Sequence, residues 1–249
     1  MKIELIRAYA DVRPFDVSKL DFEYEKGYDR PAWIYVKGLP ERTGYLKINL
    51  NGRRLRYGYG VLAKLPLYMP LNYTKDELRR YYNKFAEYYD GCFSNLEFAQ
   101  FLFSKVEARK EDRILEIGCG TGVSSLPFVR AGFTDVTLTD FSEEMVEVAK
   151  NREELAGCKF ISGDIRTLKF EGKFDVIFSV LALGKSAYFD KEEMASIYEK
   201  VAGLLESKGK LAIFGNAYSP PKYLFELVEE GSFGLARTSR HKWAVWRKR

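Results

Sequence analysis

The feature that most constrains the fold of this 249-residue chain is an alternation of apolar and amphipathic segments. Continuous apolar runs predict strands at residues 113–118, 135–140, 159–164, 174–182 and 210–216. Amphipathic runs between them predict helices at residues 124–132, 142–157 and 191–207. Apolar strands that alternate with amphipathic helices are typical of a parallel sheet covered on both faces. The pattern therefore predicts a doubly wound α/β fold.

The segments around this alternation extend it at both ends. Helical patterns precede it at residues 74–91 and 95–110. After it, Ser219-Pro220-Pro221 predicts the start of a further helix, and residues 232–249 predict two strands around a polar turn. These two strands would close the sheet at one edge.

The first seventy residues have a different character and predict short strands at 2–13, 20–25 and 31–38. Asn51-Gly52 favours a type I′ turn, so a hairpin is expected that pairs Ile48 with Leu55 and Lys47 with Arg56. Residues 65–73 contain two prolines and are predicted to be a connector. We therefore expect two domains, a β-rich region at 1–73 and an α/β domain at 74–249.

The strand at 113–118 runs into a glycine-rich loop that reads "ILEIGCGTG" over residues 114–122. Glycines lack a Cβ atom, so a ligand can lie against the loop backbone. Val123 stands where a dinucleotide fingerprint requires its third glycine, and no Gly-Lys-Ser/Thr follows for a phosphate loop. Glu116 has the wrong charge for a pyrophosphate pocket, which favours a cationic ligand.

Two further acids stand at strand ends. Asp140 closes the strand at 135–140, and Asp164 closes the strand at 159–164. A carboxylate at the end of a second strand can accept both hydroxyls of a ribose. An acid at the end of the third strand can accept from an adenine amino group, with Phe141 and Ile165 flanking the base. The three acids together predict a nucleoside site.

These segments, "ILEIGCGTG", "VTLTDFSEEMVEVAK", "FISGDIRTL" and "FDVIFSVLAL", resemble in order and spacing the motifs of class I S-adenosylmethionine-dependent methyltransferases. The resemblance covers about residues 75–249 and implies a Rossmann-like, mostly parallel, seven-stranded sheet. It also implies S-adenosyl-L-methionine as cofactor, S-adenosyl-L-homocysteine as product, and no metal.

The resemblance implies a role for each residue at this site. Glu116, Gly118 and Gly120 would line the methionine portion of the cofactor. Asp140 would hold the ribose, Phe141 would lie against the adenine, and Asp164 would bind the adenine amine. Ile165 would flank the base, and Tyr82 and Tyr89 would lie on a helix that covers the pocket. No general base is identified.

The methyl acceptor is left open among three hypotheses. A small-molecule acceptor is favoured by the tyrosine-rich leading helix and by a mildly acidic middle of the chain, with 17 Lys and Arg against 23 Asp and Glu over residues 91–236. RNA (tRNA or rRNA) is the alternative, because residues 1–90 and the last thirteen residues are basic. The second alternative is a non-catalytic scaffold that binds the cofactor. Residues 181–190 are expected to face the acceptor.

Composition places the chain among globular proteins, with 46% hydrophobic and 30% charged residues. No run is long enough for a membrane span, and the N-terminus does not resemble a signal peptide. Three cysteines without metal-ligand spacing favour neither a disulfide framework nor a metal site. We therefore expect a cytoplasmic protein, and the oligomeric state stays open.

Overall fold

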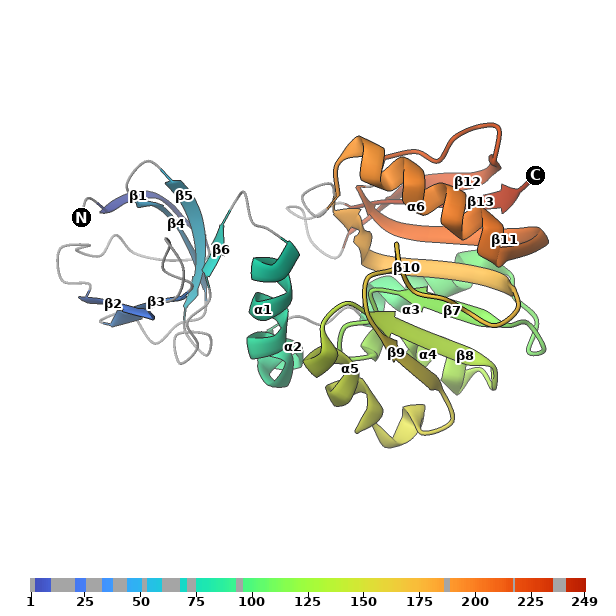
Figure 1. Ribbon diagram of the computed structural model, residues 1–249, viewed down its shortest axis with the longest axis horizontal. Helices are drawn as coiled ribbons and strands as arrows, with labels where there is room; N and C mark the ends of the chain where they lie inside the picture. The colour runs from blue at the N-terminus through green and yellow to red at the C-terminus, as the bar shows by residue number, and fades with distance from the viewer. Residues whose placement is uncertain are drawn as a thin grey trace. The chain divides into compact units, whose positions relative to one another are not determined.

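The computed structural model of the protein describes residues 3–9, 21–25, 33–37, 44–50, 53–59, 68–70, 75–92, 96–185, 189–216, 218–234 and 241–249. The chain divides into two compact units, Met1–Phe93 and Ser94–Arg249. Each unit has its own sheets, and the two are described separately below (Figure 1). Among the described residues, no helix combines the length and the apolar character that crossing a membrane requires.

The N-terminal unit is built from antiparallel strands. One sheet has the order β1-β4-β5-β6, and β2 and β3 form a separate pair. The strands are β1 (Ile3–Tyr9), β2 (Asp21–Glu25), β3 (Trp33–Lys37), β4 (Gly44–Leu50), β5 (Arg53–Tyr59) and β6 (Tyr68–Pro70). The hairpin register is confirmed, because Ile48 pairs with Leu55 and Lys47 with Arg56. The expected connector contains β6, which pairs with β5.

Short helices complete the N-terminal unit. They are α1 (Lys75–Phe85), the 3-10 turn η3 (Ala86–Tyr88) and α2 (Tyr89–Cys92). Helix α1 contacts β6 of the same unit. The structural division therefore falls at residue 93, about twenty residues after the boundary expected from the sequence. The change of pattern at residue 74 marks the start of a helix and not the start of a separate unit.

The C-terminal unit contains the seven-stranded sheet that the sequence predicts, with the order β12-β13-β11-β10-β7-β8-β9. Strands β7, β8, β9, β10 and β11 pair in parallel, and β13 pairs antiparallel with both β11 and β12. From β7 the parallel strands continue through β8 to β9 on one side and through β10 to β11 on the other. The strand order therefore reverses between β7 and β10. Their bounds are β7 (Ile114–Ile117), β8 (Val136–Asp140), β9 (Lys159–Ser162), β10 (Phe174–Lys185), β11 (Leu205–Asn216), β12 (Phe225–Phe233) and β13 (His241–Lys248).

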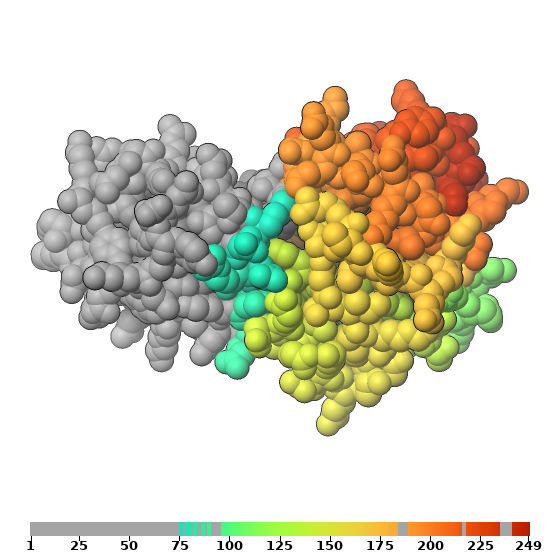
Figure 2. All heavy atoms as spheres, in the orientation of Figure 1, coloured from blue at the N-terminus to red at the C-terminus, as the bar shows by residue number. Residues whose placement is uncertain are grey.

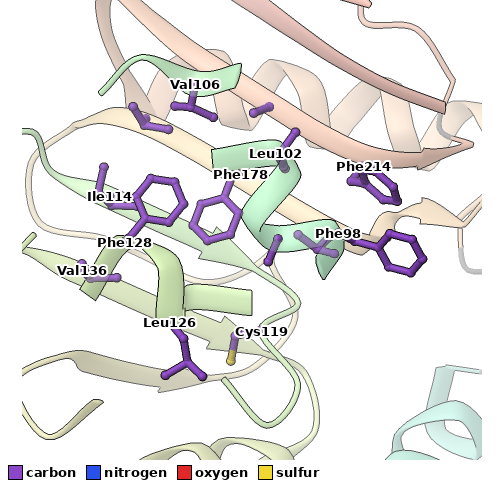
Figure 3. Packing of buried hydrophobic residues seen from close by; sticks show 14 of the residues in the cluster. Phe98, Leu102, Val106, Ile114, Cys119, Leu126, Phe128, Val136, Phe178 and Phe214 are labelled. Atoms are coloured by element: carbon purple, nitrogen blue, oxygen red, sulfur yellow. The ribbon is translucent and has the colours of Figure 1, made fainter. Parts of the chain in front are cut away.

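Helices cover both faces of this sheet, and alternate strand residues supply the two cores. On one face, Ile114 and Phe178 pack with residues of α3 (Leu96–Val106) and α4 (Leu126–Arg130). Figure 3 shows this cluster, in which the rings of Phe128 and Phe178 stack with centroids 4.6 Å apart. On the other face, Leu115 packs with residues of α6 (Lys191–Leu204). The remaining elements are η4 (Val123–Ser125), α5 (Glu143–Lys150) and η5 (Glu153–Leu155).

The prediction of a helix after Ser219-Pro220-Pro221 is wrong. The N–H groups of Leu224 and Phe225 donate to the C=O of Pro221 at 3.0 and 3.1 Å, which closes a single turn. Strand β12 begins directly afterwards and pairs with β13 along its length. Pairing across the sheet edge therefore overrides the local helix signal. Of the two strands predicted within residues 232–249, the second is confirmed as β13, whereas the strand that pairs with it, β12, begins at Phe225 and ends at Phe233.

Candidate functional site

The glycine loop leaves the carboxyl end of β7 at the point where the strand order reverses, which is where α/β sheets bind ligands. Gly118, Gly120 and Gly122 have φ of +77°, +53° and +82°, a region that residues with a side chain rarely adopt. A Cβ atom on Gly118 would stand 2.1 Å from the Cβ of Ala182. A Cβ atom on Gly122 would stand 2.4 Å from Leu155. The loop therefore needs glycine for its conformation and for its close contacts.

Backbone hydrogen bonds join the ends of three neighbouring strands. The N–H groups of Gly118 and Cys119 both donate to the C=O of Thr139, at 2.7 and 2.9 Å. The N–H of Gly163, just after β9, donates to the C=O of Asp140 at 2.8 Å. The loop, the end of β8 and the end of β9 therefore form one connected surface, which brings together the segments that carry the predicted acids.

Asp140 ends β8 and accepts hydrogen bonds from the glycine loop. Its Oδ2 accepts from the N–H of Gly120 at 2.8 Å, and its Oδ1 accepts from the N–H of Ser142 at 2.9 Å. Burial raises the pKa of Asp140, while the N–H groups of Ser142, Gly120 and Phe141 oppose the rise. Asp140 as a whole is half-buried, so part of the residue stays exposed beside the loop.

Glu116 lies beneath the loop, with no exposed surface. Its Oε1 accepts from the hydroxyl of Ser124, and its Oε2 accepts from the hydroxyl of Ser125 at 2.5 Å. Burial raises the pKa of Glu116 to about 7, even though both hydroxyl groups favour the charged form. Glu116 therefore binds the turn that follows the loop, and it does not face an open surface.

Asp164 follows β9 and is bound by an arginine two residues later. The Nε of Arg166 lies 3.0 Å from both Asp164 oxygens, and its Nη2 lies 2.5 Å from Oδ2. The Nη1 of Arg166 donates to Oε1 of Glu193 at 2.7 Å. These contacts with Asp164 are charge-assisted, and they fix the position of the carboxylate.

The hydrophobic residues beside these acids have different positions. Ile165 is 6% exposed and packs in the core under α6, and its place beside the base stays a prediction. Phe141 is half-buried at the end of β8. Tyr82 and Tyr89 belong to the N-terminal unit, where their ring centroids lie 6.4 Å apart. That these two tyrosines cover the cofactor pocket stays a prediction.

The carboxyl-terminal part of β10 lies against the glycine loop at Ala182. Leu181 has φ of +63°, an unusual value for a side chain with this bulk, and the pairing of β10 with β11 is irregular after Val180. The N–H of Leu183 donates to the buried hydroxyl of Ser179 at 3.0 Å, which holds this bend. The start of the expected acceptor segment therefore lies at the loop, while its residues 186–188 are outside the described residues.

Among the described residues, neither a cysteine nucleophile at Cys119 nor a metal site is supported. Burial raises the pKa of the Cys119 thiol well above its ordinary value, so the thiol stays protonated and fills space in the core. Within the described ranges, no three His, Cys, Asp or Glu side chains gather in a way that could hold a metal ion.

Sequence reasoning missed Ser124, Ser125 and Arg166 as parts of this site. The serine pair directly follows the glycine loop, and a buried acid on the preceding strand needs such donors. Arg166 stands two residues after Asp164, which is within reach of the carboxylate in a tight turn. Both signals are present in the sequence, but each becomes specific only once the strand ends are known to meet.

Comparison with known proteins identifies a domain within the C-terminal unit. Residues 114–209 match the family described as a methyltransferase domain. The malonyl-[acyl-carrier protein] O-methyltransferase 1 of Ilyobacter polytropus is 32% identical over 126 residues, which cover 49% of this chain and 43% of the relative. The corresponding enzyme of Bacillus anthracis is 36% identical over 117 residues, which cover 43% of this chain and 42% of the relative.

A solved structure with the same fold is the magnesium protoporphyrin IX methyltransferase of Synechocystis PCC 6803 with bound SAH. It superposes with a TM-score of 0.55 at 18% identity, covering 71% of this chain and 100% of that chain. Residues 114–209 therefore carry a class I S-adenosylmethionine-dependent methyltransferase domain in a Rossmann-like sheet. The chain spans less than half the length of the two curated relatives above.

Proposed function

We propose that the protein transfers a methyl group from S-adenosylmethionine to a small-molecule acceptor. The observation that carries the proposal is the connected surface at the ends of β7, β8 and β9. There, a loop of three left-handed glycines meets Asp140 through the Gly120 N–H at 2.8 Å. The match of residues 114–209 to the methyltransferase domain family supports the same function.

The residues at this surface fit a nucleoside joined to an amino acid. Gly118 and Gly120 would line the methionine portion, and Glu116 would support them from below through the serine turn. The half-buried Asp140 would accept from the ribose hydroxyls, with Phe141 against the base. Asp164 would accept from the adenine amine. Backbone near Ile165 would border the base, since its side chain is in the core.

The bound cofactor supplies an electrophilic methyl group on a positively charged sulfur. The protein then has to hold the donor, align the acceptor and exclude water. The glycine loop and the bend at Leu181 lie against each other through the Gly118–Ala182 contact. This contact brings the donor loop next to the segment that would face the acceptor.

A carboxylate is the acceptor group that we propose to test first. The two relatives above are named as O-methyltransferases of malonyl groups on a carrier protein. Carboxylates are ionised at neutral pH, so their methylation needs no general base. This agrees with a site for which no base was predicted from the sequence. We therefore propose an acyl carboxylate, free or joined to a carrier.

The decisive experiment is a methyl-transfer assay with S-adenosylmethionine labelled in its methyl group. Malonyl and longer acyl groups would be offered both as thioesters and as free acids, beside fractions of small molecules, RNA and protein from cell extract. Label is expected in the acyl or small-molecule fraction. Label found only in the RNA fraction would overturn the proposal of a small-molecule acceptor. Binding of the cofactor without label in any fraction would favour the scaffold.

The RNA alternative has less support than the small-molecule acceptor. The relatives above act, by their names, on carrier-bound malonyl groups and a porphyrin. A cytoplasmic location fits the proposed function, because Cys119 and Cys158 are free thiols, which a reducing compartment preserves.

A further inference from the structure

Arg166 holds the carboxylate of Asp164 by several contacts at once. Its Nε lies 3.0 Å from both oxygens, its Nη2 lies 2.5 Å from Oδ2, and its backbone N–H donates to Oδ1 at 2.9 Å. A planar guanidinium in this arrangement fixes both the position and the plane of a carboxylate. Asp164 therefore has a defined orientation before any ligand arrives.

The other end of the guanidinium is held by α6. Its Nη1 donates to Oε1 of Glu193 at 2.7 Å. The Oε2 of Glu193 accepts from the N–H of Asp190 at 3.0 Å, while Oδ1 of Asp190 accepts from the N–H of Glu193 at 2.8 Å. This capping box fixes Glu193 in the first turn of the helix. Figure 2 shows the segment after β9 adjoining α6 on this face.

The hydrogen bonds with Asp164 raise the pKa of Arg166, so the guanidinium stays charged beside the carboxylate. An ionised carboxylate only accepts hydrogen bonds, whereas a protonated one also donates. The Asp164 side chain is 31% exposed, so a ligand can still reach it. An amino group on a base would donate to this carboxylate, and a keto oxygen at the same position would be repelled.

We propose that Arg166 is a positioning residue that makes the site select a base with an amino group over one with a keto group. The inference rests on the proposed function, since it assigns Asp164 to the base of the cofactor. Glu193 contributes by keeping the guanidinium in place between β9 and α6.

The test compares the binding of two ligands by calorimetry to the full chain. The ligands are S-adenosylhomocysteine and S-inosylhomocysteine, which differ by an amino or a keto group on the base. We expect the wild-type chain to bind the amino ligand about 100-fold more tightly, because a charged hydrogen bond is exchanged for a repulsion. In Arg166→Gln this ratio should fall about tenfold, and in Arg166→Lys by about threefold.

Arg130→Gln is the matched control, because Arg130 makes a similar two-point contact with Glu154 on the surface, at 2.9 and 3.3 Å. The ratio of its affinities for S-adenosylhomocysteine and S-inosylhomocysteine should equal that of the wild type. If Arg166→Gln does not fold, as followed by thermal unfolding, Arg166→Lys decides the test. An unchanged ratio with retained binding would overturn this inference alone. No binding of S-adenosylhomocysteine by the wild type would overturn the proposed function as well.

Discussion

At the scale of single residues, two acids one strand apart have opposite surroundings. Glu116 is fully buried and accepts from two hydroxyl groups, whereas Asp140 is half-buried and accepts from backbone N–H groups. Alternation along β7 explains this difference, since Glu116 shares the face of Ile114, which packs under α3 and α4. Of these two acids, Asp140 is the one that keeps some exposed surface.

Asp140→Ala should weaken the binding of S-adenosylhomocysteine by about 100-fold or more, because charged hydrogen bonds to two hydroxyls would be lost. The N–H groups of Gly120 and Ser142 would also lose their acceptor. Calorimetric titration measures the change. Asp135→Ala is the control, since Asp135 precedes the same strand at its other end and pairs with Arg113 and Lys159. Equal affinities of the two variants would contradict the nucleoside assignment.

Glu116 should make stability depend on pH. Its pKa in the folded chain is about 7, above its ordinary value of 4.5, so folding favours the protonated form. The stability that it contributes is complete below pH 4.5 and is lost as the pH rises through about 7. At 1.36 kcal/mol per unit, the loss is about 3 kcal/mol.

Glu116→Gln cannot ionise and should escape this loss. Between pH 4.5 and 8.5, the unfolding free energy of Glu116→Gln relative to the wild type should rise by about 3 kcal/mol. Urea denaturation at a series of pH values measures both curves. Parallel curves would show that Glu116 does not titrate in this range.

At the scale of elements, glycines have separate roles in the loop and in α6. Gly118 has φ of +77° and lies against Ala182, whereas a Cβ atom on Gly203 would meet nothing within 4 Å. Gly203 is in α6, where glycine costs helix stability. The same substitution should therefore have opposite effects at these two positions.

Gly118→Ala should destabilise the fold by about 2 kcal/mol or more, from left-handed strain and the contact with Ala182. Gly203→Ala should stabilise it by about 0.5–1 kcal/mol. Denaturant unfolding of both variants at one pH measures the two changes in the free energy of unfolding. A change of the same sign in both would contradict the assigned role of the loop.

At the scale of the whole molecule, an aromatic core joins the helical layer to the far edge of the sheet. Phe214 of β11 is 0% exposed, and its ring stacks on Phe98 of α3 with centroids 4.8 Å apart. Phe98 in turn contacts Phe233 of β12 and His241 of β13. The antiparallel hairpin at the sheet edge is therefore packed into the main core.

Phe214→Ala should lower the unfolding free energy by about 3–5 kcal/mol, because it leaves a cavity in this core. Leu227→Ala is the control, since Leu227 lies on the edge strand β12 and is 51% exposed. It should change stability by no more than about 0.5 kcal/mol. Chemical denaturation of both variants measures the contrast. A loss below 1 kcal/mol for Phe214→Ala would show that the core closes around the cavity.

The sequence by itself determined the features that depend on local pattern. Apolar runs and glycines predicted the parallel strands and the loop "ILEIGCGTG", and Asn51-Gly52 predicted the register of β4 with β5. These signals are local because turn chemistry and side-chain periodicity act over a few residues.

Only the tertiary structure decided how those elements combine. It grouped α1 with the N-terminal unit and replaced a predicted helix by β12, because pairing partners lie far away in the sequence. It also buried Ile165 and joined Arg166 to Asp164 and Glu193. Burial and ion pairing depend on which strand ends are neighbours. Those neighbours are set only when the whole sheet has formed.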